Sequence, residues 1–199
     1  MKYILVIVSL FIFSGCIVEK KPSITDYKLT TKLEQFSSSS NGCKDKILKI
    51  SKAFSTPSLI SLRMSYVQDE NKVFSYSKSQ WLTSPSKDIA NKIYLSVKDS
   101  KLFKYVNLEI SRSGSEYLME IIIEDFMQYY DEKLDSSYAN VKIDINIIDL
   151  KDSSIIATNE FSSKVDVKTL DAEGGVEALN IALNNVIKQN LEWLNGVCE

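Results

Sequence analysis

The stretch that decides the fold is Val141-Lys142-Ile143-Asp144-Ile145-Asn146-Ile147. Apolar and polar residues alternate there without interruption, and successive side chains of a β-strand point to opposite faces of a sheet. The alternation therefore predicts a half-buried strand, which extends from Tyr138 to Leu150. Similar strands are predicted before it, over Tyr117 to Tyr130, and after it, over Ile155 to Val167. Because the connections are too short for crossover helices, the three strands should form an antiparallel meander.

Shorter strands are predicted in the N-terminal part of the chain. Alternating, β-branched and aromatic residues between turn-forming residues mark them. Asp69-Glu70-Asn71 is a natural turn, so the strands on either side of it should form a hairpin. The predicted segments are Tyr27 to Leu33, Lys46 to Lys52, a turn and a strand within Pro57 to Val67, Val73 to Trp81, and Leu102 to Val106.

Two amphipathic helices complete the predicted domain. Ser84-Pro85 opens the first, because serine favours the N-cap and proline the first helical position. The second runs from about Ala172 to Asn195, with Asp171 as its N-cap and Gly196 as its stop. Apolar residues form one stripe along this helix, which is typical of a face that covers a sheet. The sequence thus predicts an α+β fold with a mainly antiparallel β-sheet covered by two helices in a single domain.

The N-terminus has the features of a lipoprotein signal. Lys2 precedes an apolar run from Tyr3 to Phe13, which is too short for a membrane-spanning helix and suits a signal-peptide core. Phe13-Ser14-Gly15-Cys16 follows and is similar to the bacterial lipobox, in which the cysteine thiol is lipidated. We therefore expect a signal peptide over residues 1–15, lipidated Cys16 with a tether over 16–26, and the folded domain over 27–199. Ile17, rather than aspartate, follows the cysteine, which favours the outer membrane over the inner membrane.

Composition narrows the function. The chain of 199 residues carries a formal net charge of -2 and contains no histidine. This charge argues against nucleic acid as a partner, because phosphate binding needs a concentrated basic face. Without histidine, Ser-His-Asp triads and imidazole zinc sites are excluded. We expect no enzyme activity, no catalytic residues, no cofactor and no metal.

Two groups of side chains have both a functional and a structural interpretation. They are the carboxylates Glu120, Glu124, Asp125 and Asp144 and the aromatics Tyr129, Tyr130 and Tyr138. The carboxylates could form an acid–base pair, but we expect them at solvent-facing positions of half-buried strands. The tyrosines could contact a lipid or a partner, but sheet packing is the favoured interpretation.

An apolar segment follows Pro57 and contains Leu59, Ile60 and Leu62. Large apolar side chains that are exposed together often mark a site for another protein or for a membrane. We therefore regard this segment as the candidate partner-binding site.

Cys43 and Cys198 are the two thiols that remain once Cys16 is lipidated. The mature chain would work in an oxidising compartment, where an even pair of cysteines often closes a disulfide. Cys43 lies just before the strand at Lys46, and Cys198 lies just after the last helix. A helix packed across the sheet could bring them together, so we predict a bridge between them.

Four stretches together give the chain a family resemblance. They are Tyr76-Ser77-Lys78-Ser79-Gln80-Trp81 followed by Pro85, Leu102-Phe103-Lys104-Tyr105-Val106, Asp125-Phe126 with the strand ending in Leu150, and Glu173-Gly174-Gly175-Val176-Glu177-Ala178-Leu179-Asn180 through Trp193-Leu194. In this order and spacing they resemble the ABC-type transport auxiliary lipoproteins, the PqiC-like family, over nearly the whole mature chain. One departure is Gln80, which stands where the family commonly has arginine.

The resemblance implies a non-catalytic accessory component of an MCE-type ABC lipid transport system between the inner and outer membranes. The implied partners are an MCE-domain protein, the ABC permease and ATPase subunits, and the membrane that holds the lipid anchor on its periplasmic side. Phospholipid binding and homo-oligomerisation are left open. The alternatives are a lipoprotein subunit of another envelope assembly and, with less support, a membrane-tethered enzyme that modifies lipid or cell wall.

Overall fold

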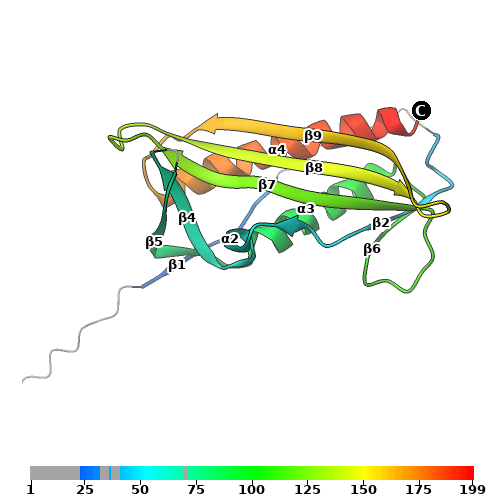
Figure 1. Cartoon of the computed structure of the whole chain (residues 1–199), viewed down its shortest axis with the longest axis horizontal. Coiled ribbons are helices and arrows are strands. Elements are labelled where there is room, and N and C mark those ends of the chain that lie inside the picture. The colour runs from blue at the N-terminus through cyan, green and yellow to red at the C-terminus, as the bar shows by residue number, and fades with distance from the viewer. Residues whose placement is uncertain (1–22, 32–35, 37–40, 70) are drawn as a thin grey trace, which may run out of the picture.

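The computed structural model describes residues 23–31, 36, 41–69 and 71–199. In these residues one nine-stranded sheet carries two long helices, which contact each other, and forms an elongated α+β domain (Figure 1). The first strand lies toward one end of the molecule and the C-terminus lies at the other (Figure 1). A single α+β domain is what the sequence predicts.

Three long strands form the centre of the sheet. They are β7 (Tyr117–Tyr130), β8 (Ser137–Asp149) and β9 (Ser154–Asp166), and they pair in antiparallel order. This confirms the predicted meander, with bounds that agree to within one residue. Every second side chain of β8 is buried, so the alternating pattern directs one face of the sheet into the core.

The other edge of β7 takes three short strands in succession. β2 (Ile47–Ile50), β3 (Phe54–Ser55) and β4 (Arg63–Gln68) pair with it in parallel, one after another along its length. The sheet is completed at this edge by β5 (Lys72–Trp81) beside β4, by β1 (Thr25–Tyr27) beside β5, and by β6 (Tyr105–Leu108) beside β2. β4 and β5 form the predicted antiparallel hairpin.

The prediction of a mainly antiparallel sheet with two helices is therefore corrected. Among the described residues, five strand pairings are parallel (β1–β5, β2–β6, and β2, β3 and β4 with β7) and three are antiparallel. The sheet is mixed because the chain runs from β2 to β4 along β7 in one direction, without a hairpin between them. The segment after Thr56 also forms a helical turn, α2 (Pro57–Ile60), so the described residues contain three helices.

The long helices are α3 (Pro85–Ser100) and α4 (Ala172–Val197). α3 begins after Ser84, as predicted, with the proline in its first turn. The Asp171 carboxylate accepts a hydrogen bond from Gly174 N at 2.9 Å, which confirms Asp171 as the N-cap of α4. Gly196 does not end α4, because the helix continues to Val197 and Cys198 is its C-cap.

The core lies between the sheet and these helices. Ile143, Ile145 and Ile147 of β8 and Leu183 and Ile187 of α4 are at most 1% exposed. Burial of a side chain of this size contributes roughly 1.5–3 kcal/mol. The interface between the sheet and α4 is therefore a main source of stability.

A β-bulge changes the alternation within β7. The register with β8 shifts between Ile123 and Asp125, which leaves Glu124 as the extra residue. Odd-numbered residues from Met119 to Ile123 are buried, whereas from Phe126 onward the even-numbered residues are buried. The bulge thus turns both Glu124 and Asp125 away from the core.

Candidate functional site

The predicted docking segment lies only partly on the surface. Leu59 is 4% exposed, whereas Ile60 and Leu62 are 64% and 46% exposed. α2 causes this division, because neighbouring residues of a helical turn point in different directions. Leu59 therefore belongs to the core, and of the three candidate apolar side chains Ile60 and Leu62 are the ones that a partner can reach.

Ile60 lines a groove with a volume of about 720 Å³. The groove lies among the segment that joins β2 to β3, the end of α2, the start of α3 and the residues at the end of β6. The apolar residues that line it are Ile50, Ala53, Ile60, Ala90, Leu108 and Ile110. We call this pocket the apolar groove. Leu108 and Ile110 are 37% and 79% exposed, so large apolar side chains from two distant parts of the chain stand open to solvent around one groove.

Hydrogen bonds hold the walls of the apolar groove together. Glu109 N donates to the Ile50 carbonyl at 2.9 Å, and the Glu109 carboxylate accepts from Lys52 N at 3.1 Å. Ser86 Oγ of α3 donates to the Ala53 carbonyl at 3.4 Å. These bonds join the β6, β2 and α3 segments without using the apolar side chains. The groove is therefore built before any partner arrives.

Ile60 and Leu62 were predicted from the sequence as contact residues, whereas Leu108 and Ile110 were not. Val106, Leu108 and Ile110 alternate with polar residues, which is typical of a strand and does not show that Leu108 and Ile110 lie beside α2. They reach α2 only because β6 pairs with β2 in parallel.

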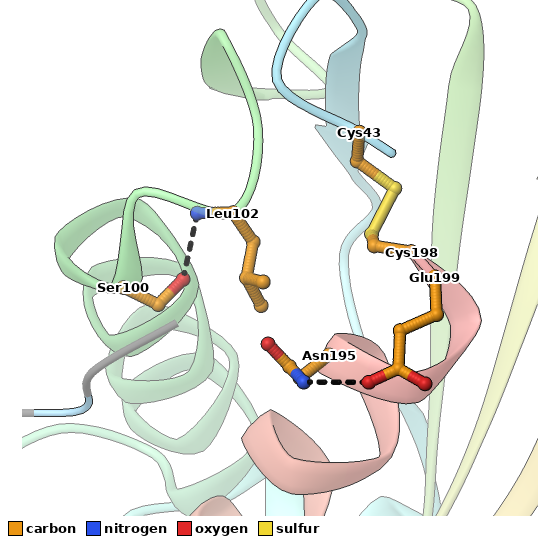
Figure 2. The surroundings of a disulfide bond; sticks show 6 residues. All are labelled: Cys43, Ser100, Leu102, Asn195, Cys198 and Glu199. Carbon is orange, nitrogen blue, oxygen red and sulfur yellow. Dashed lines mark hydrogen bonds between the residues drawn. A yellow bond between two sulfur atoms is a disulfide. The ribbon is translucent and has the colours of Figure 1, made fainter. Parts of the chain in front are cut away.

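The predicted disulfide is present, and Figure 2 shows its surroundings. Cys43 and Cys198 are bridged with their Cα atoms 5.2 Å apart, although 155 residues separate them in sequence. Gly42 packs so closely on the Cys198 carbonyl that a Cβ atom at position 42 would overlap it. Glycine is needed for this approach of one backbone to another. The bridge fastens the segment before β2 to the end of α4.

Two of the stretches that carry the family resemblance contact each other, and Gln128 joins the first of them to the stretch at the start of α4. Trp81 packs on Phe126 with ring centroids 5.8 Å apart. Tyr76 Oη donates to the side-chain carbonyl of Gln128 at 2.8 Å, and burial raises the pKa of Tyr76. Gln128 is 3% exposed, and Gly175 packs directly on its amide. Side chains of β5 and β7 and the backbone of α4 thus form one contact, which ties β5 and α4 to the central strand β7.

Gln80, the residue that departs from the family pattern, joins β5 to β1. Its Nε2 donates to Asp26 Oδ1 at 2.8 Å. A carboxylate that could pair with an arginine at position 80 is therefore present. The bond in this chain is from a neutral amide to a carboxylate.

The outward face of the central strands carries a cluster of ion pairs. Lys142 Nζ lies 2.7 Å from Glu124 and 2.9 Å from Glu160. A hydrogen bond from Lys142 lowers the pKa of Glu124, whereas partial burial and the neighbouring Glu124 raise the pKa of Asp144. Oxygens of Glu124, Asp144 and Glu160 lie within 4.8 Å of one another, but the Lys142 ammonium already supplies positive charge there. We therefore assign this cluster a structural role. Glu120 lies on the same outward face.

The tyrosines flanking the β7–β8 turn make contacts within the chain. Tyr129 stacks on Tyr138 with ring centroids 5.1 Å apart, and the Lys164 ammonium lies 3.5 Å from the Tyr138 ring centroid. Tyr130 is 7% exposed, and its hydroxyl lies 2.8 Å from that of Tyr76. These contacts favour the packing interpretation of all three.

Asp125 is held in a half-buried hydrogen-bond network. Tyr129 Oη donates to Asp125 Oδ2 at 2.8 Å, and Asn140 Nδ2 donates to the same oxygen at 2.7 Å. Burial raises the pKa of Asp125 above its ordinary 3.8, and the two hydrogen bonds offset part of this rise. The fold therefore favours the protonated carboxyl more than the unfolded chain does.

Asp125→Asn should remove one component of the dependence of stability on pH. A raised pKa contributes stability that is fully present below the unfolded value near 3.8 and is lost as the pH rises through the folded value. Urea unfolding between pH 3 and pH 7 should show the wild type losing stability relative to the variant over this window. At neutral pH the variant should be at least as stable as the wild type. If the difference in unfolding free energy between variant and wild type does not change with pH, or changes in the opposite direction, the raised pKa of Asp125 is contradicted.

Cys16 and most of the tether lie outside the described residues, so lipidation and the cleavage site stay predictions. Among the helices that the structure describes, none has both the length and the apolar character needed to cross a membrane.

The sequence matches no protein-family model and no curated protein. Solved structures share the fold. XCC0632 from Xanthomonas campestris, of the family DUF330, matches with a TM-score of 0.76 and 16% identity over 87% of this chain and 96% of that one. A second, uncharacterized protein matches with a TM-score of 0.61 and 10% identity over 80% of this chain and 99% of that one. The chain therefore has the fold of XCC0632.

Proposed function

We propose that the protein is a lipid-anchored, non-catalytic accessory component of an MCE-type ABC lipid transport system, held on a membrane that faces the periplasm. The fold is the observation that supports this most. It extends over 96% of XCC0632, and DUF330 is the PqiC-like auxiliary lipoprotein family. The sequence resemblance points to the same family. Two of the stretches that carry it contact each other in the fold, and Gln128 joins the first of them to the stretch that opens α4.

The apolar groove is the proposed contact surface for the MCE-domain protein. Ile60, Leu108 and Ile110 expose large apolar side chains there, and Leu62, two residues after Ile60, is exposed as well. A preformed groove with exposed apolar walls suits a protein partner, because burying those walls releases water at little cost in ordering the site. The outer membrane is the proposed location of the anchor, and an accessory subunit there would meet an MCE bridge that starts from the inner membrane.

Crosslinking in cells followed by pull-down of the full chain tests this function. We expect recovery of an MCE-domain protein together with permease and ATPase subunits. Ile60→Asp combined with Leu62→Asp should abolish that recovery, because two charges would have to be desolvated in the contact. Leu59 is left unchanged, since a carboxylate in the core would unfold the domain.

Val73→Asp is the matched control. Val73 is 63% exposed, close to the 64% of Ile60, and it lies near the tip of the β4–β5 hairpin, away from α2. It should not alter recovery. If pull-down returned subunits of a different envelope assembly, that assembly would replace the MCE system as the proposed partner. Turnover of a lipid or a cell-wall substrate by the purified protein would contradict the non-catalytic assignment.

A further inference from the structure

β9 is a free edge of the sheet. Within the described strands it pairs with β8 alone, and it runs along one side of the molecule (Figure 1). Val167 N donates to the Ser137 carbonyl at 2.9 Å, and this bond shows which residues of β9 form backbone hydrogen bonds with β8. In an antiparallel pair alternate residues bond to the neighbouring strand. From Ala157 to Val165 the odd-numbered residues therefore direct their backbone N–H and C=O groups toward β8, and the even-numbered residues from Thr158 to Asp166 direct theirs outward.

The outward N–H and C=O groups of β9 form a row with which a further strand could form hydrogen bonds. Gln189 Nε2 of α4 donates to the Ser162 carbonyl at 3.4 Å from outside the β8–β9 ladder, as expected for a carbonyl that points away from β8. This is the one hydrogen bond to the row within the described part of the chain. A carbonyl can accept two hydrogen bonds, so the Ser162 carbonyl can still accept a second. A long strand edge of this kind is a template for pairing with another chain.

The side chains along this edge are self-complementary in charge. Glu160 and Lys164 stand two residues on either side of Ser162. Their contacts with Lys142 and with the Tyr138 ring place both on the face opposite the helices. If a second β9 runs antiparallel with Ser162 opposite Ser162, Glu160 of each copy lies opposite Lys164 of the other. Opposite charges at directly facing positions stabilise a strand pair.

Other registers lose this match. Sliding one strand by two residues sets Glu160 opposite either Ser162 or Asp166, and sliding it by four sets Glu160 opposite Glu160 or Lys164 opposite Lys164. Like charges at facing positions destabilise the pair. A slide by one residue would set the buried Phe161 opposite an outward side chain. The register centred on Ser162 is thus favoured both by the pairing of opposite charges and by keeping each side chain on its own face of the sheet.

We propose that two copies of this chain associate through β9, antiparallel and centred on Ser162, into one continuous sheet. The helices fit this arrangement. The second β9 would lie about 4.8 Å away, and α4, which packs on β8 and β9, would meet its counterpart at about 10 Å, a normal distance between packed helices. Ile181, which is 45% exposed, lies one turn before Asn185, whose amide donates to Ser163. The second copy would cover this apolar side chain.

Disulfide trapping of the full chain in cells tests the interface. In the proposed register Ser162→Cys brings two cysteines to facing positions with Cα atoms about 5.5 Å apart, which suits a disulfide. We expect a reducible dimer of twice the chain mass on non-reducing gels. Thr158→Cys is the matched control, because it lies on the same edge and face but opposite Asp166, and it should give no dimer.

Charge exchange separates this pairing from an unspecific contact. Adding Lys164→Glu to Ser162→Cys should reduce the dimer about tenfold, because both attractive pairs become repulsive. Adding Glu160→Lys as well should restore it. The proposal is overturned if Ser162→Cys gives no dimer, if Thr158→Cys gives as much, or if the double exchange fails to restore it. A crosslink to a different protein would also overturn it, since the edge would then serve another partner.

Discussion

A double variant, Cys43→Ala with Cys198→Ala, is expected to lose about 5 kcal/mol of unfolding free energy. The bridge closes a loop of 155 residues, and without it the unfolded chain regains the conformational freedom that this loop denies. Alanine is preferred to serine because the cysteines are 6% and 3% exposed, and a buried hydroxyl would need a partner. In a domain of this size the loss corresponds to a fall in Tm of roughly 10–20 °C. Urea unfolding and thermal circular dichroism measure both quantities.

Reducing agent supplies the control for this variant. Reduced wild-type protein should approach the stability of the double variant, which should not itself respond to reductant. Hydrogen exchange should also rise in the last turn of α4 near Val197, because the bridge holds that end against the segment before β2. A loss below about 1 kcal/mol would mean that the bridge hardly restricts the unfolded chain.

Gly175→Ala is expected to cost about 2–4 kcal/mol, a large effect for the addition of one methyl group. Its Cβ would overlap the side-chain amide of Gln128. That amide cannot move away cheaply, because it accepts from Tyr76 Oη at 2.8 Å and donates to Ser137 Oγ at 3.0 Å. Either α4 shifts away from β7, or these buried partners lose their hydrogen bonds. The free energy of unfolding from urea titration measures the cost.

Gly196→Ala is the matched control, since it makes the same change in the same helix. A Cβ at position 196 meets nothing within 4 Å, and alanine is the better helix former by about 0.5–1 kcal/mol. This variant should be as stable as the wild type or more stable. Equal losses at positions 175 and 196 would mean that the contact with Gln128 does not constrain α4.

The predictions that the structure confirms rest on patterns among residues that are close together in the sequence. Alternation between Val141 and Ile147 is sufficient to define β8, and short connections then make β7 and β9 its antiparallel neighbours. Asp171 caps α4 through a bond to an amide three residues away. The bridge between Cys43 and Cys198 joins residues that are distant in the sequence. It could still be predicted, because with Cys16 lipidated only one pairing of the remaining two cysteines is possible.

The features that the sequence did not predict depend on distant partners. A strand as short as β2 or β3 carries no local sign that its neighbour is β7 or that it runs parallel to it. The apolar groove has the same origin, because Leu108 and Ile110 approach Ile60 through the β2–β6 pairing. Leu59 and Ile60 are equally apolar, and only the helical turn of α2 decides which of them is buried.

The arrangement around β7 also dictates the order in which the chain can fold. Leu48 of β2 pairs with Tyr117, and Tyr66 of β4 pairs with Gln128, so the N-terminal strands are synthesised well before the strand that they need. The β7–β9 meander closes through short turns, whereas joining β2 to β7 closes a much longer loop, which is slower. The edges of β2, β3 and β4 that pair with β7 must therefore stay unpaired until β7 is available, and unpaired strand edges are prone to aggregate. The yield of native protein then depends on how fast the meander forms, or on a chaperone that shields the first half of the chain in the meantime.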